Sequence, residues 1–143
     1  TPTNGAQPQT ANNNHAERGI RVSSLFEDDL TYLTDAHKKV VKTLERWGFE
    51  IQEEVGFPPY RVDIYIPDFH VAVEVDGPQH EKSRDVKRDA TLLDIYALPV
   101  FRITITVVGK SEKWARSFAE FIDEWRDDVE NRWEFCRDRI PWL

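Results

Sequence analysis

Apolar residues recur along this chain with two periods, and each period predicts a different kind of element. Steps of three and four residues predict helices, whereas strict alternation predicts strands. Turn-forming Gly and Pro residues separate the segments. The predicted helices cover about 35–47, 83–96 and 111–135, and the predicted strands cover 49–55, 60–66, 70–76 and 100–108.

The order of these elements predicts the fold class. The strands 60–66 and 70–76 are separated by a short Pro-Asp turn and form a hairpin, and the helix 83–96 then crosses to the strand 100–108. A hairpin followed by a helical crossover favours an α/β fold in which helices flank a mixed sheet. The segment 111–135 has aromatic residues at helical spacing, which predicts a long C-terminal helix.

The composition predicts one folded domain preceded by a tail. Residues 1–20 hold many Thr, Asn, Gln and Pro residues and almost no apolar ones, so we expect a flexible polar tail. Residues 21–143 are expected to form a single domain, with a core over 34–108 and the C-terminal helix over 111–135. The 40% hydrophobic and 12% aromatic content excludes global disorder.

The sequence also argues against membrane insertion, secretion, disulfide bonds and a structural zinc site. No apolar run approaches the ~20 residues that a membrane helix needs, and the start of the chain lacks a signal-peptide pattern. We therefore expect a cytoplasmic or nucleoid-associated protein that is not secreted and has no membrane partner. The single cysteine, Cys136, excludes an internal disulfide, and no Cys/His cluster has zinc spacing.

The net charge argues against a protein that grips nucleic acid over its whole surface. Nineteen Lys and Arg residues against 26 Asp and Glu residues give a formal charge of −7. Phosphate affinity depends on clustered cations. The acidity is uneven, however: residues 79–110 hold six cations and four acids, whereas 111–143 hold six and nine. A local basic site therefore stays compatible with the composition.

Three acids of the predicted hairpin are the main candidates for chemistry. By strand parity Asp63 lies on one face of the first strand, and Glu74 and Asp76 share one face of the second. Carboxylates brought together repel one another unless a cation lies between them, and Mg²⁺ or Mn²⁺ accepts such oxygen ligands. A metal held in this way activates water and stabilises the charge on a scissile phosphate. The alternative is that these acids simply form the solvent face of the sheet.

A histidine and a group of cations follow the three acids. His80 has a pKa range suited to ligation or proton transfer. The predicted helix then places cations where a phosphate backbone would need neutralising, with Lys87 or Arg88 as the source of transition-state charge. The alternative is a solvated helix face. The predicted nucleic-acid contacts are Lys82, Arg84, Lys87 and Arg88, and the predicted catalytic residues are Asp63, Glu74, Asp76, His80 and Lys87.

The segment VDIYIPDFHVAVEVDGPQH, followed by Lys87-Arg88-Asp89 and LPVFRIT, resembles a known family. It is similar, over residues 35–106, to the very-short-patch-repair-like branch of the PD-(D/E)XK nuclease superfamily. The resemblance implies a restriction-endonuclease-like fold and Mg²⁺-dependent hydrolysis of DNA, with Asp63 and Glu74 as metal ligands. Asp76 takes the place of the usual Lys, and His80 falls where this branch keeps a histidine. The first-helix acid of many such nucleases aligns with His37, or less closely with Glu45.

The expected function is therefore that of a metal-dependent DNA endonuclease using Mg²⁺, for which Mn²⁺ can substitute. DNA is the expected partner, and targeting would come from a homodimer or from a separate domain or protein. Two alternatives stay open. The sequence EVDGPQH also resembles the RAP domain, which implies a non-catalytic RNA-binding module. A protein-interaction domain would use the aromatic C-terminal helix, including Trp133, Phe135 and Trp142.

Overall fold

The computed structural model describes residues 23–77 and 82–141, with side chains from Thr34 onward. The chain divides into two compact units, Thr1–Thr34 and Asp35–Leu143. Helix α2 (Ser23–Arg46) begins in the first unit and ends in the second. All the sequence-predicted site residues belong to the second unit, which contains the expected core.

The second unit is built around a four-stranded mixed sheet in the order β2-β3-β4-β5. Strands β2 (Gln52–Phe57), β3 (Tyr60–Ile66) and β4 (Val71–Asp76) pair antiparallel, whereas β5 (Val100–Thr104) pairs parallel with β4. Helix α3 (Lys82–Tyr96) makes the crossover that parallel pairing requires. The predicted mixed sheet flanked by helices is confirmed.

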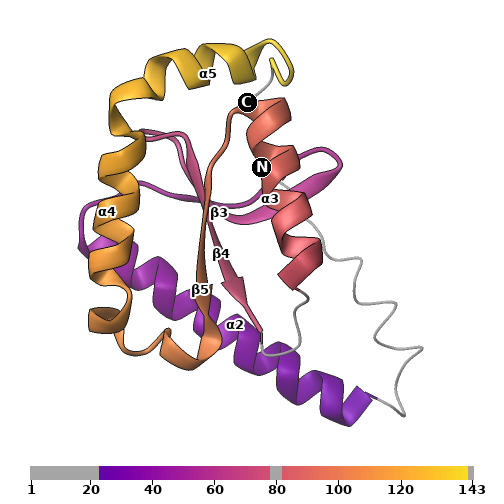
Figure 1. The fold of residues 1–143 in the computed structure, drawn as a ribbon. Coiled ribbons are helices and arrows are strands. Elements are labelled where there is room, and N and C mark those ends of the chain that lie inside the picture. Colours follow the sequence, from indigo (N-terminus) through magenta and orange to yellow (C-terminus); the bar gives the residue numbers. More distant parts are fainter. Residues whose placement is uncertain (1–22, 78–81, 142–143) are drawn as a thin grey trace. The chain divides into compact units, whose positions relative to one another are not determined.

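Helices cover both faces of this sheet, with α3 on one side and α4 (Ala115–Trp125) on the other (Figure 1). On the α3 side a core cluster joins Tyr65 and Ala72 of the sheet to Leu92 and Tyr96 of α3. On the α4 side the ring of Phe118 lies 5.2 Å from that of Phe101. Because both faces are covered, every residue of β4 is buried.

The bounds of three predicted elements need correction. The first helix begins at Ser23, not near residue 35, because helix-compatible spacing without Pro or Gly extends back through SSLFEDDLTYLT. Strand β2 spans Gln52–Phe57 and not 49–55, since its pairing with β3 begins at Gln52 and ends at Phe57, which pairs with Tyr60 across the turn. Strand β5 ends at Thr104 and not at residue 108, because its partner strand ends at Asp76.

The C-terminal segment is helical as expected, but it is divided. Helix α4 is followed by a 3₁₀ turn, Arg126–Asp128, and then by α5 (Val129–Arg137). Part of its aromatic stripe packs into the core: Trp114 and Phe118 are buried, whereas Phe121, Trp125 and Trp133 are partly buried. Among the helices that the structure describes, none is long and apolar enough to cross a membrane.

Candidate metal centre

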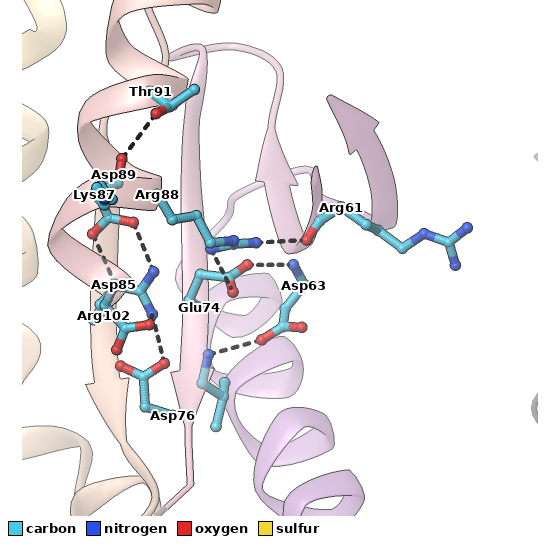
Figure 2. A network of polar contacts seen from close by, with 11 residues as sticks. Arg61, Asp63, Glu74, Asp76, Asp85, Lys87, Arg88, Asp89, Thr91 and Arg102 are labelled. Atoms are coloured by element: carbon cyan, nitrogen blue, oxygen red, sulfur yellow. Dashed lines mark hydrogen bonds and ion pairs between the residues drawn. The ribbon is translucent and has the colours of Figure 1, made fainter. Parts of the chain in front are cut away.

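Strands β3 and β4 part where the candidate acids begin. Their last regular pair on this side is Ile64 with Val73. Beyond it the backbone groups bond to side chains: the Asp63 amide donates to Glu74 Oε2 at 2.6 Å, and the Val75 amide donates to Asp63 Oδ2 at 2.9 Å (Figure 2). The two carboxylates therefore replace ladder hydrogen bonds and lie side by side at the point of divergence.

Asp63 also meets two residues from other elements. One ligand atom each from Asp63, from His37 of α2 and from Glu54 of β2 all lie within 4.8 Å of one another. Asp63 and His37 are partly buried, whereas Glu54 is exposed. One imidazole nitrogen and two carboxylate oxygens form a donor set that suits a transition ion such as Mn²⁺ better than Mg²⁺, which prefers oxygen ligands alone. These residues therefore fit Mn²⁺, the ion expected to substitute for Mg²⁺, better than Mg²⁺ itself.

Glu54 lies opposite Asp63 and has an unusual backbone conformation. The β2–β3 pairs Glu53 with Ile64 and Val55 with Val62 flank it, so Glu54 faces Asp63 across the two strands. Its φ of 54° lies in the left-handed region that non-glycine residues seldom adopt. Strain of this kind costs about 1–3 kcal/mol and is concentrated at functional sites. Partial desolvation of its carboxyl, and then the charge of Asp63, raises the pKa of Glu54.

His37 has a second carboxylate on its ring. Its Nε2 lies 2.9 Å from Glu53 Oε1, and a carboxylate accepts the proton of that nitrogen. Such a contact fixes the tautomer, leaves the other nitrogen with a lone pair and is typical of metal-ligating histidines. Glu53 thus orients His37, whereas Glu54 belongs to the donor group itself.

Glu74 is buried, with 8% of its surface exposed. Burial raises the pKa of its carboxyl well above the ordinary value, and the negative charge of Asp63 raises it further. Arg88 of α3 lies on the other oxygen, with Nη1 3.2 Å from Oε1. Arg88 also donates to the carbonyl of Arg61 at 2.7 Å and lies over the ring of Tyr60.

Asp76 points to a different partner. Arg102 of β5 donates to Asp76 Oδ1 at 2.7 Å and makes two further bonds to Asp89 of α3, at 2.6 and 2.9 Å. Asp85 lies 3.6 Å from the same guanidinium. Asp76 is also 8% exposed, so the solvent-face alternative fails for both Glu74 and Asp76.

The predicted cations differ in position. Lys82, Arg84 and Lys87 are exposed on α3, whereas Arg88 is half-buried against Glu74. Of the two residues considered for transition-state charge, Arg88 is therefore the one beside the acids. His80 lies outside the described residues.

The structure thus brings together part of the predicted set. Asp63 and Glu74 lie side by side, whereas Asp76 is held by Arg102. The aligned position His37 meets Asp63, and Glu45 is exposed. Sequence reasoning missed Glu54 and Arg102. Only the β2–β3 register could have pointed to Glu54, and the sequence pattern did not predict that these two strands pair.

Comparison of the chain with protein families, with curated proteins and with solved structures found no match in any of the three.

Proposed function

We propose that this protein is a metal-dependent endonuclease that hydrolyses DNA phosphodiester bonds, with a restriction-endonuclease-like fold of the very-short-patch-repair-like branch. One observation carries the proposal. Asp63, the acid predicted from the hairpin to be a metal ligand, lies with His37 and Glu54 in a three-residue donor group. That group lies where β3 and β4 part, next to the second predicted acid, Glu74.

In this proposal Asp63, His37 and Glu54 hold the divalent ion. The bound ion would supply a Lewis acid for an attacking water and for a phosphate oxygen. Glu74, whose carboxylate accepts from the Asp63 amide, would lie next to this donor group and help to position the substrate. Arg88 supplies a fixed positive charge that faces the developing charge on phosphate.

The surroundings of the site support a phosphate-backbone substrate. Helix α3 starts near the acids and exposes Lys82, Arg84 and Lys87, whose charges suit successive phosphates. These cations are few, which fits a small footprint on the nucleic acid. Targeting would then be shared with a second copy, another domain or another protein.

The test is cleavage of supercoiled plasmid, with single-stranded DNA and RNA assayed in parallel. We expect nicking with Mg²⁺ or Mn²⁺ and none with EDTA. Asp63→Asn should lower the rate by at least about 100-fold, since a metal ligand acts on the transition state. Asp94→Asn is the matched control: this α3 carboxylate is exposed and lies outside the donor group, so its rate should stay at the wild-type level.

Two outcomes would overturn the proposal. Unchanged cleavage by both Asp63→Asn and His37→Gln would exclude this donor group as the active centre. RNA binding without cleavage of any substrate, and without dependence on divalent ions, would instead favour the non-catalytic RAP-like module.

A further inference from the structure

Arg102 lies at the meeting point of three carboxylates from two elements. Its guanidinium contacts Asp76 of β4, and Asp89 and Asp85 of α3, at 2.7, 2.6 and 3.6 Å respectively (Figure 2). Three acids that converge in this way repel one another unless a cation lies between them. In many phosphate-cleaving sites that cation is a second metal ion.

We propose that Arg102 takes the place of a second divalent cation, so that the centre binds a single metal ion, on the side of Asp63, His37 and Glu54. This inference rests on the proposed function. It assigns Asp76 to Arg102 as an anchoring residue and removes it from the set of metal ligands that the sequence suggested.

The geometry of the guanidinium supports this assignment. Nε and Nη2 of Arg102 bond the two oxygens of Asp89, which is the bidentate arrangement that fits arginine and not a point charge. Nη1 is then directed to Asp76. A divalent ion placed on Asp76 would face this permanent positive charge at close range.

Burial and the nearby negative charges stabilise the ion pairs of Arg102. The side chain of Arg102 is 19% exposed and that of Asp76 is 9% exposed, so solvent screens the pair poorly. Burial by itself lowers the pKa of Arg102, but the hydrogen bond to Asp89 and the charges of Asp76, Asp89 and Asp85 together raise it above the ordinary value. The guanidinium therefore stays charged at every accessible pH.

The contacts of Arg102 also position α3 relative to Glu74 of β4. Arg102 fixes Asp89 on α3, and the neighbouring residue Arg88 contacts Glu74. A side chain of β5 thereby sets the position of α3 against the paired acids. A metal ion in this place would exchange with solvent, whereas the arginine is permanently in place.

The experiment is a Mn²⁺ titration followed by calorimetry and by electron paramagnetic resonance, which count bound ions without reference to activity. We expect the wild-type protein to bind one Mn²⁺ and Asp63→Asn to lose it. Asp76→Asn should keep that ion with a Kd within about threefold of the wild type. Arg102→Ala should gain one additional ion among the three acids from which it removes the guanidinium.

Two control variants distinguish the loss of the positive charge at position 102 from non-specific effects of a substitution. Arg102→Lys keeps a positive charge and should not gain an ion. Arg126→Ala removes an exposed arginine that pairs with Asp123, and its ion count should equal that of the wild type. Circular dichroism and urea unfolding show which variants are folded. If Arg102→Ala does not fold, the Mn²⁺ affinity of Asp76→Asn tests the role of Arg102 instead.

The results distinguish this inference from the proposed function. A Kd raised more than roughly tenfold in Asp76→Asn, or a folded Arg102→Ala without an extra ion, would overturn the role of Arg102. If the wild type binds no ion while Arg102→Ala binds one, the role of Arg102 holds and the proposed metal centre fails.

Discussion

At the scale of single residues, His70 shows how a buried polar group is fully satisfied by its neighbours. It is completely buried, and its φ of 49° turns the chain between β3 and β4. Nε2 donates to the carbonyl of Tyr96 at 2.9 Å, so Nδ1 accepts from the hydroxyl of Tyr65 at 2.8 Å. Burial lowers the pKa of His70 to about 4; the hydrogen bond to Tyr96 opposes this shift, and the nearby charge of Arg132 adds to it.

This pKa predicts an acid-sensitive fold. Below pH 6.5, the ordinary pKa of histidine, His70 becomes protonated in the unfolded chain, whereas in the folded protein it stays neutral down to about pH 4. The free energy of unfolding should therefore fall as the pH drops from 6.5 to 4, by about 3 kcal/mol from this group. Urea unfolding over this range checks it, with His70→Gln for comparison.

His70→Gln should have a lower free energy of unfolding than the wild type at pH 7, and the difference between the two proteins should shrink towards pH 4. Parallel pH profiles for the two proteins would show that His70 takes up its proton equally in the folded and unfolded states.

At the scale of elements, Arg132 connects α5 to the rest of the fold by hydrogen bonds to backbone carbonyls. This α5 residue is buried, and its two Nη groups donate to four backbone carbonyls at 2.7 to 3.2 Å. The carbonyls belong to Phe69, His70, Ala97 and Trp125. One arginine thus joins the β3–β4 turn, the end of α3 and the end of α4.

Arg132→Lys should destabilise the fold by roughly 3 kcal/mol, because an ammonium cannot reach four carbonyls in this planar arrangement and leaves some of them unpaired. Urea unfolding measures the change. Arg126→Lys is the matched control: its ion pair with Asp123 is exposed, so the expected change is within about 0.5 kcal/mol. Equal effects of the two variants would contradict the role of Arg132.

At the scale of the whole molecule, charge is distributed unevenly. The chain carries a net −7, yet α3 presents Lys82, Arg84 and Lys87 beside the candidate centre. Under the proposed function, DNA would be held by these three residues and Arg88. A protein of this kind binds weakly and tolerates salt better than one with an extensive basic surface.

Four phosphate contacts predict a log–log slope of DNA affinity against salt of about −3 to −4. Fluorescence anisotropy with a labelled duplex in EDTA measures it. Lys87→Ala should reduce the slope by about one unit, whereas Lys113→Ala, in the acidic C-terminal part, should leave it unchanged. A slope near about −10 would indicate a much wider surface than the one proposed.

Local patterns predicted most of the elements and part of the site. The bounds of β3 agree with its alternation, and α3 begins within one residue of its predicted start. Strand parity correctly placed Asp63 beside Glu74, because opposed residues of a hairpin point to the same face. It could not show that Asp76 turns to Arg102, since these two residues meet only through the parallel pairing of β4 with β5.

The sequence by itself determined the order of helices and strands, the hairpin and the pair of neighbouring acids, because periodicity and turn residues act over short stretches of chain. Only the tertiary structure decided which side chains meet from separate elements: His37 and Glu54 with Asp63, Arg88 with Glu74, and Arg102 with three acids. Those meetings depend on strand register and helix docking, which are fixed by packing of the whole core and not by any local pattern.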